Sequence, residues 1–196
     1  MDINEQKQNL RIQMTDILRD IPEKERALQS RTLMKMLTES DLYVNCRSIL
    51  TYVSMPEEPD TRELIKKALR DQKKVYVPKI MGDRMEFFRL QELSELNSGA
   101  MGIPEPEGNP AYVFPYTLHD SLESAQQCLV IVPGLAFDHA LGRLGRGKGY
   151  YDRFLSSFHK CMKIGYAFTG QIVDQIPCTE QDARMDLILT VQEVIH

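Results

Sequence analysis

Closely spaced glycines and cationic side chains alternate in one stretch of the chain, VPGLAFDHALGRLGRGKGYYDRFL, which runs from Val132 to Leu155. The residues that carry this pattern are Gly142, Arg143, Gly145, Arg146, Gly147, Lys148 and Gly149. Glycine lets the backbone adopt positive φ and turn N–H groups toward an anion, and the interleaved cations add positive charge. The stretch therefore predicts a phosphate-binding site.

Regular elements are expected on both sides of this loop. The apolar run from Cys128 to Val132 predicts a buried strand that ends at Pro133. After the loop, apolar residues have the spacing of one helical face: Tyr151, Phe154, Leu155 and Phe158. A strand, a Gly-rich loop and a helix N-terminus in this order favour an anion, because the free N–H groups and the helix dipole act together. The alternative, a flexible basic loop exposed to solvent, is less consistent with such a rigid frame.

The two common glycine motifs for phosphate do not match. Gly142 to Lys148 fits the pattern G-x-x-x-x-G-K, but Gly149 stands where a P-loop needs a Ser or Thr hydroxyl for Mg²⁺. The dinucleotide pattern G-x-G-x-x-G fails because Tyr150 stands at its last glycine. The loop is therefore neither a P-loop nor a dinucleotide-binding loop.

Three residues at the start of the predicted helix carry further functional groups. Asp152 lies in its first turn, where the dipole favours a carboxylate even without a metal. Since the loop lacks the P-loop hydroxyl, Asp152 is also the nearest candidate to reach Mg²⁺. Tyr151 belongs to the apolar stripe and is expected in the core, whereas Tyr150 points about 100° away and can lie against a flat ligand ring.

The order of elements elsewhere predicts an α/β fold. Ser48 to Val53 is expected to form a strand, a helix with a capping box of Asp60 and Glu63 begins near Thr61, and a second strand covers Lys74 to Ile80. This is a βαβ unit, which implies parallel strands. Further elements are predicted over Asn4 to Asp20, Pro22 to Thr38, Met85 to Arg89, Gln91 to Leu96, Lys163 to Phe168, Gln171 to Gln175 and Leu187 to Thr190. We expect a single three-layer α/β/α domain over residues 1–196, with an open, mostly parallel, Rossmann-like sheet.

The segment from Gly99 to Pro110 is rich in glycine and proline. It is expected to be irregular, with Glu105 and Glu107 as solvated loop charges.

An open parallel sheet binds its ligands at the carboxyl ends of the strands. This rule selects three loops, Ser54 to Asp60, Pro133 to Gly149 and Thr169 to Asp186. The acidic and amide side chains in them are Glu57, Glu58, Asp138, Gln171, Asp182 and Asp186. Acids and cations that converge in this way suit Mg²⁺ with a nucleoside triphosphate.

The composition limits the class of protein. A net charge of −4 argues against general nucleic-acid binding, which needs a basic surface. The first residues lack the apolar region of a signal peptide, and no apolar run has the length of a membrane span, so we expect the cytoplasm and no membrane. Four scattered cysteines with no C-x-x-C pair predict reduced thiols rather than disulfides or a zinc site.

The segments PGLAFD and RLGRGKGYYDRFL resemble the 5-formyltetrahydrofolate cyclo-ligase family, also called 5,10-methenyltetrahydrofolate synthetases. The core R-L-G-x-G-x-G-Y-Y-D is very specific to that family. Two further matches are YVSMPEEPDT, from Tyr52 to Thr61, and Phe168 with Gln171. The chain departs from the family pattern at Gln181, where many members have His before Asp182, and at Val191, where Glu is common.

The resemblance implies roles for individual residues. It assigns ATP binding to Lys7, Arg11, Arg143, Leu144, Gly145, Arg146, Gly147, Lys148, Gly149, Tyr150 and Tyr151. It assigns folate binding to Val53, Glu58, Arg146, Gly147, Lys148, Gly149 and Tyr150. It associates Asp152 and Asp182 with the metal, and Arg146 and Lys148 are the expected catalytic residues. From the residues alone, Lys7 and Arg11 are a solvated basic pair that opposes the helix dipole.

The implied reaction is ATP- and Mg²⁺-dependent cyclisation of 5-formyltetrahydrofolate to 5,10-methenyltetrahydrofolate, with release of ADP and phosphate. It proceeds through phosphorylation of the formyl oxygen and ring closure by N10. Two alternatives remain open. One is a small-molecule kinase on the same α/β frame, and the other is an RNA-binding module that uses RLGRGKGYY, which the acidic net charge disfavours.

Overall fold

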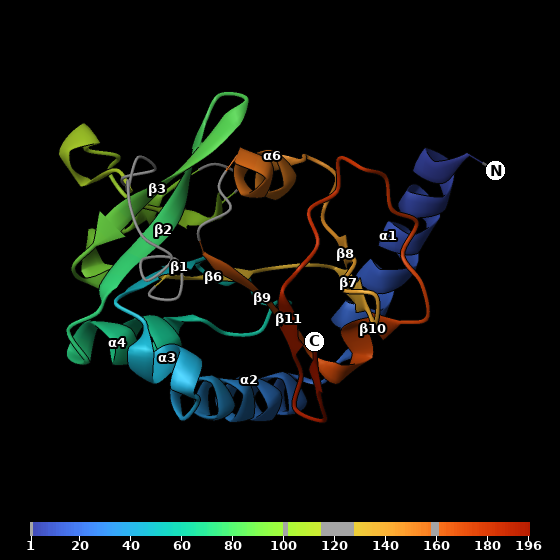
Figure 1. Ribbon diagram of the computed structural model, residues 1–196, viewed down its shortest axis with the longest axis horizontal. Helices are drawn as coiled ribbons and strands as arrows, with labels where there is room; N and C mark the ends of the chain where they lie inside the picture. Colours follow the sequence, from blue (N-terminus) through green and yellow to red (C-terminus); the bar gives the residue numbers. More distant parts are fainter. Residues whose placement is uncertain (1, 100–101, 115–127, 158–160) are drawn as a thin grey trace.

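A large, mostly parallel sheet forms the centre of the molecule (Figure 1). The computed structural model describes residues 2–99, 102–114, 128–157 and 161–196. In these residues the main sheet has seven strands in the order β12-β11-β9-β6-β1-β2-β3. Their bounds are β1 Ser48–Thr51, β2 Lys74–Met81, β3 Arg84–Leu90, β6 Cys128–Val132, β9 Met162–Tyr166, β11 Leu187–Leu189 and β12 Val194–Ile195. The five central strands are parallel, and β3 and β12 are antiparallel edge strands.

Apolar layers cover the main sheet on both faces. All five residues of β6 are buried, as expected for a parallel strand that is covered on both sides. Neighbouring residues of β1 face opposite layers: Ile49 packs with the helices α2 (Glu23–Thr38), α3 (Asp41–Asn45) and α4 (Arg62–Arg70), whereas Leu50 packs with Phe154 of α6 (Tyr150–Ser157). Figure 1 shows these helices on opposite sides of the sheet. The predicted layered α/β fold with a mostly parallel sheet is confirmed.

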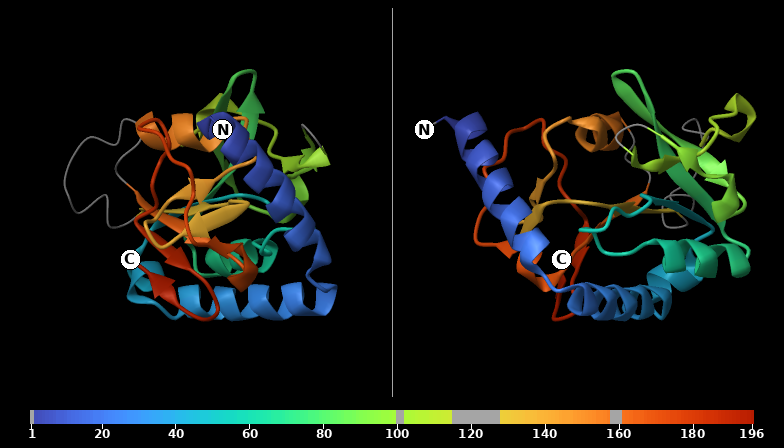
Figure 2. Two further views of the ribbon diagram at one scale, coloured as in Figure 1. Left: turned by 90° about the vertical axis from the view of Figure 1, so that its right-hand side faces the viewer. Right: turned by 180° about the vertical axis from the view of Figure 1, so that it is seen from behind.

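The first helix, α1 (Ile3–Asp20), packs beside a smaller sheet rather than on the main one (Figure 2). That sheet has the order β10-β7-β8, with β7 Ala136–Asp138, β8 Arg143–Leu144 and β10 Ile172–Val173. Asp2 and Glu5 form a capping box that starts α1. Met14 and Leu18 are buried against Leu144 of β8, so this apolar contact holds α1 beside the hairpin that precedes the Gly-rich loop.

The predicted βαβ unit is present, with β1 and β2 parallel on either side of α4. The capping box of Asp60 and Glu63 is wrong. Thr61 is the N-cap of α4 and makes no side-chain capping bond. The carboxylate of Asp60 instead accepts from the Arg62 N–H at 3.0 Å and from the Ser54 hydroxyl at 2.8 Å, so it holds the loop after β1 closed.

The prediction of irregular structure from Gly99 to Pro110 is also wrong in part. Strands β4 (Asn97–Ser98) and β5 (Pro104–Glu105) form an antiparallel hairpin. Glu105 is buried in it, whereas Glu107 is exposed as expected. The predicted helix from Gln91 to Leu96 is a single 3₁₀ turn, η1 (Leu93–Glu95). Two more 3₁₀ turns are η3 (Pro110–Tyr112) and η4 (Thr169–Gln171). The helical turn expected from Gln171 to Gln175 is wrong, because the chain leaves η4 at Gln171 and continues as a short strand at Ile172–Val173.

The predicted helix after the Gly-rich loop is α6, in which Phe154 and Leu155 are buried as expected. Phe158 lies outside the described residues. None of the helices in the part of the chain that the structure describes is both long and apolar enough to cross a membrane.

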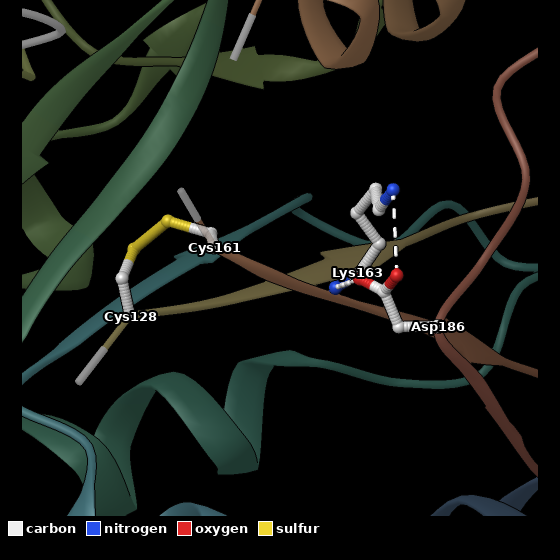
Figure 3. Close-up of a disulfide and its surroundings, with 4 residues drawn as sticks. All are labelled: Cys128, Cys161, Lys163 and Asp186. Atoms are coloured by element: carbon white, nitrogen blue, oxygen red, sulfur yellow. Dashed lines mark hydrogen bonds and ion pairs between the residues drawn. A yellow bond between two sulfur atoms is a disulfide. The ribbon is translucent and has the colours of Figure 1, made fainter. Parts of the chain in front are cut away.

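The expectation of reduced thiols is wrong for one pair of cysteines. Cys128 and Cys161 form a disulfide, with 4.8 Å between their Cα atoms (Figure 3). The cause is the register of two parallel strands: Leu129 of β6 lies opposite Met162 of β9, so the residues just before them are also neighbours. Cys46 and Cys178 are free. The separation of 33 residues conceals this proximity in the sequence.

Removal of the Cys128–Cys161 disulfide should destabilise the protein. Because it closes a loop of 33 residues, chain entropy predicts that Cys161→Ser lowers the free energy of unfolding by about 3 to 4 kcal/mol. Urea unfolding without reductant measures this change, and Cys178→Ser, which removes a free thiol, is the matched control. Thiol titration of the unfolded, unreduced protein should find only Cys46 and Cys178; reaction of all the cysteines would contradict the disulfide.

An ion pair ties α1 to the loop that precedes β11. The Lys7 ammonium donates to both oxygens of Asp182, at 2.7 and 2.6 Å. The backbone N–H and hydroxyl of Thr179 also donate to this carboxylate, at 2.6 and 2.9 Å. Burial alone would raise the pKa of Asp182, but the hydrogen bonds from Lys7 and Thr179 outweigh it and hold the pKa below its usual value.

Asp182→Asn should therefore destabilise the protein in a pH-dependent way. A lowered carboxyl pKa adds stability above the unfolded-state pKa of about 4, and that stability is lost as the pH falls through the folded-state pKa. We expect a loss of about 1 kcal/mol at neutral pH, after screening by solvent, that shrinks below about pH 4. Urea unfolding over a pH series measures it. Asp16→Asn, which removes an exposed pair with Arg19, should change little, and an equal loss from Asp182→Asn at every pH would refute the interpretation.

Candidate active site

A cavity of about 300 Å³ opens at the carboxyl edge of the main sheet. Strand β1 lies at the centre, with β2 on one side and β6 on the other, so the chain changes direction across the sheet at this point. Ligands of open α/β sheets bind at such a switch point. The cavity is lined by the loops after β1 and β6, by the N-terminal half of α1, by the β4–β5 hairpin and by the start of α6.

The Gly-rich loop forms the cationic end of the cavity. It is shorter than expected, because Gly142 belongs to the β7–β8 turn, where its N–H donates to Asp138 at 2.8 Å. The loop that faces the cavity is Gly145–Gly149, between β8 and α6. Gly147 and Gly149 have φ of +92° and +68°, which side chains rarely tolerate. Lys148 is exposed and has no ion-pair or hydrogen-bond partner in the described structure, so its ammonium is available to an anion.

The buried side chain of Arg143 holds this loop in place. Its side chain is only 3% exposed, and its guanidinium donates to the Pro133 carbonyl at 3.1 Å and to Asp152 at 2.8 Å. It thereby joins the end of β6 to the first turn of α6. Its Nε has no partner within the described residues. Leu144 is buried against α1 and also lines the cavity.

Lys7 and Arg11 lie in the wall of the cavity, so their interpretation as a solvated pair is wrong. Arg11 Nε donates to the Gly145 carbonyl at 3.0 Å, and Lys7 pairs with Asp182. The anion that compensates these cations in the first turns of α1 comes from a segment 175 residues away, which the sequence conceals.

Asp152 and Asp182 both line the cavity next to the Gly-rich loop. Asp152 Oδ1 accepts from Arg143 at 2.8 Å and from the Ala183 N–H at 3.3 Å, so the two acids come from adjoining segments. The described residues contain no group of three or more metal-ligating side chains. Mg²⁺ needs only one or two carboxylates, since phosphate oxygens and water complete its shell. The donor set therefore fits Mg²⁺ with a bound phosphate.

The other end of the cavity is largely apolar. Its walls are the side chains of Tyr52, Val53, Met55, Pro78, Ile80, Met85, Ile103, Tyr150 and Tyr151. Tyr150 donates to the Gly82 carbonyl at 3.3 Å, and the Arg153 guanidinium lies 5.2 Å from its ring centroid. Tyr151 packs edge-on against Phe87, as predicted for a core residue, but it also borders the cavity. Burial raises the pKa of its hydroxyl, which has no partner in the described structure.

Glu58 lines the cavity beside Arg146 of the Gly-rich loop. Its Oε2 accepts from the Met55 N–H at 3.0 Å, and its Oε1 lies 3.4 Å from Nη2 of Arg146. The side chain is 11% exposed. Burial raises its pKa, and the Met55 N–H and the Arg146 guanidinium offset part of that rise.

Three of the polar residues expected at the sheet edge have structural tasks instead. Asp138 is buried and accepts from the N–H groups of Gly142 and Ile176, both at 2.8 Å. Gln171 is buried and donates to the Gly134 carbonyl at 2.6 Å. Asp186 accepts from the Lys163 N–H at 2.8 Å between neighbouring strands (Figure 3). These side chains hydrogen-bond to backbone groups, because the N–H and C=O groups of buried loops need partners.

Glu105 is the cavity residue that the sequence missed most clearly. It lines the apolar end, although it was expected to be solvated. Nothing in the sequence distinguishes it from Glu107, since both stand in the same Gly- and Pro-rich segment. Asn4 and Ile103 were likewise not predicted to lie at the site.

Comparisons with known proteins identify the family of this chain. The model of the 5-formyltetrahydrofolate cyclo-ligase family matches residues 3–191. A probable 5-formyltetrahydrofolate cyclo-ligase of Schizosaccharomyces pombe is 33% identical over 184 residues, which cover 86% of each chain. The 5-formyltetrahydrofolate cyclo-ligase of Mus musculus is 31% identical over 198 residues, covering 95% of this chain and 94% of the mouse protein.

Solved structures show the same fold. The NMR structure of Aquifex aeolicus 5,10-methenyltetrahydrofolate synthetase aligns with a TM-score of 0.81 at 27% identity, and covers 96% of this chain and 91% of that one. The match of the family model to nearly the whole chain, together with the relatives above 30% identity, shows that the chain belongs to the 5-formyltetrahydrofolate cyclo-ligase family.

Proposed function

We propose that this protein catalyses the ATP- and Mg²⁺-dependent cyclisation of 5-formyltetrahydrofolate to 5,10-methenyltetrahydrofolate, with release of ADP and phosphate. The observation that carries the proposal is a single cavity with two unlike ends. One end has Lys148 and the Gly145–Gly149 loop, and the other has apolar and aromatic walls. Such a cavity suits a polyphosphate at one end and a flat ring at the other.

The chemistry requires activation of the formyl oxygen. Ring closure by N10 onto the N5-formyl carbon must expel that oxygen, which leaves poorly as hydroxide. The formyl oxygen attacks the γ-phosphorus of ATP, and the bond to ADP breaks. N10 then adds to the activated carbon and loses its proton, and the carbon–oxygen bond breaks to release phosphate. Positioning and charge neutralisation do most of the work in phosphoryl transfer, so no nucleophilic side chain is needed.

Individual residues have distinct parts in this proposal. Lys148 and Arg146 stabilise charge on the transferred phosphoryl group. ATP is held by Lys7, Arg11 and the segment Arg143–Tyr151, which borders the cavity throughout. The folate is held by the loop residues Val53, Glu58 and Arg146–Gly149 and by the ring of Tyr150, which all border the cavity. Mg²⁺, when bound, neutralises phosphate oxygens, and Asp152 and Asp182 are the residues that would hold it.

We further propose that residues 1–196 act as one domain.

We also propose that the protein works in the cytoplasm. A relative from Arabidopsis thaliana is a mitochondrial 5-formyltetrahydrofolate cyclo-ligase, so members of this family occur in more than one compartment. The Cys128–Cys161 disulfide is unusual for a reducing compartment. Fractionation of cells that express the full chain decides between these locations.

The reaction itself is the first test. Purified protein with 5-formyltetrahydrofolate, ATP and Mg²⁺ should produce the near-ultraviolet absorbance of the methenyl product, because ring closure extends conjugation across N5 and N10. ADP should form in equal amount, and omission of ATP should stop the reaction. 10-Formyltetrahydrofolate should not replace the substrate, since its formyl group is on the other nitrogen. A folded preparation that binds ATP but forms no methenyl product would reject the proposal and favour a small-molecule kinase.

Lys148→Ala should slow turnover strongly while the fold stays intact. Loss of one donor to the transition state typically costs about 10²- to 10³-fold in kcat. Lys148 is the cleaner choice, because Arg146→Ala also removes the partner of Glu58. Steady-state kinetics measure the effect, and Lys66→Ala, which removes an exposed lysine on α4, is the control. Near-normal turnover of Lys148→Ala would exclude this lysine from phosphoryl transfer.

A further inference from the structure

Glu105 is a largely buried residue whose carboxylate has no partner among the described residues. The residue is only 7% exposed, and its side chain makes neither a hydrogen bond nor an ion pair in the described structure. It borders the cavity at its apolar end, near Ile80, Met85 and Ile103. The carboxylate oxygens are not among the fully buried side-chain atoms that lack a partner, so they are reached from the cavity. A carboxylate with no protein donor that borders a cavity is free to accept hydrogen bonds from a ligand.

The hairpin around Glu105 fixes the direction of its side chain. Asn97 pairs with Glu105 across the two strands, and the Gly99 N–H donates to the Ile103 carbonyl at 2.9 Å. A Cβ on Gly99 would lie 2.4 Å from Cγ of Glu105, so the bare backbone of Gly99 covers one side of the glutamate. Only a glycine leaves that space, and the side chain is confined between this backbone and the cavity.

The hairpin is in turn fixed to the main sheet. Lys79 of β2 donates to the carbonyls of Pro106 and Glu107, at 2.8 and 3.1 Å. The neighbouring residues of β2, Pro78 and Ile80, line the cavity beside Glu105. Glu105 is thus presented from a segment that is bonded to the main sheet, as a residue that sets ligand orientation needs to be.

The two glutamates of the cavity differ in what they can accept. Glu58 already receives the Met55 N–H and lies beside Arg146. Glu105 has no side-chain partner in the described structure, and it lines the cavity together with apolar residues. A carboxylate in this state matches a flat group with two parallel N–H donors, because each oxygen then accepts one bond. The apolar surroundings favour such a ring over a strongly hydrated cation.

We propose that Glu105 binds the edge of the pterin ring that carries the 2-amino group and N3–H, and so sets the orientation of the folate. This inference rests on the proposed function, which supplies a ligand with two adjacent N–H donors on a flat ring. Held at that edge, the ring lies in the apolar end of the cavity while the Gly145–Gly149 loop holds the phosphates at the other. Glu105 is thereby a specificity-determining residue for folate and has no role in ATP binding.

Glu105→Gln tests the proposal, because the side chain keeps its size but one oxygen becomes an NH₂ that faces a ring N–H. We expect the Kd of 5-formyltetrahydrofolate to rise on the order of 10- to 100-fold, with the Kd of ATP unchanged. Since the free protein loses an unpaired buried carboxylate, its melting temperature should stay the same or rise. Glu107→Gln is the matched control two residues along the same segment, where the side chain is exposed.

A modified ligand makes the test specific. The analogue with a 2-methyl group in place of the 2-amino group should bind the unmodified protein more weakly, and Glu105→Gln should add little to that loss. Folate binding by Glu105→Gln equal to that of the unmodified protein would overturn the proposal. An equal loss for the parent folate and its analogue would also overturn it. Methenyl production by the unmodified protein separates these outcomes from failure of the proposed function, in which neither protein binds or converts the folate.

Discussion

The site depends on the hydrogen bonds that the buried guanidinium of Arg143 makes. A buried cation is stable only when its donors find acceptors, and Arg143 finds them in the Pro133 carbonyl and in Asp152. One acceptor ends the central strand β6, and the other begins α6. The Gly145–Gly149 loop follows β8 directly and leads into α6, so the contacts of Arg143 hold both ends of the loop. The same guanidinium lies 5.6 Å from the ring centroid of Tyr151, so it also fixes an aromatic wall of the cavity.

Several charges around the cavity are already paired before any ligand binds. Lys7 is paired with Asp182, and Glu58 lies beside Arg146. A ligand phosphate or metal ion that enters such a site exchanges partners with these groups, so its own charge meets a group of opposite sign. Since desolvation is the main cost of a buried ion pair, prior pairing lowers the cost of assembling the loaded site. The arrangement also suppresses repulsion among the cations while the site is free of phosphate.

Local patterns in the sequence predicted the elements whose signals are local. The strand β6, the unit β1–α4–β2 and the helix α6 follow from apolar runs and spacing over fewer than about ten residues each. The strands that were missed have two or three residues each, too few for any period to show; they are β4, β5, β7, β8, β10 and β12. The Cys128–Cys161 bond depends on strand register, and the pair of Lys7 with Asp182 joins the two ends of the chain. Neither contact can be predicted from the pattern of nearby residues.

The acidic residues of this edge illustrate why residue type alone does not identify function. Asp138 is satisfied by fixed backbone N–H groups, so it stabilises a turn and has nothing left to offer a ligand. Asp152 and Asp182 each accept from a cationic side chain, which another cation can replace. Glu105 has no side-chain donor in the described structure and borders the cavity, so it is free to accept from a ligand. The partner that each carboxylate finds in the fold, rather than the carboxylate itself, separates a structural residue from a metal ligand and a substrate ligand.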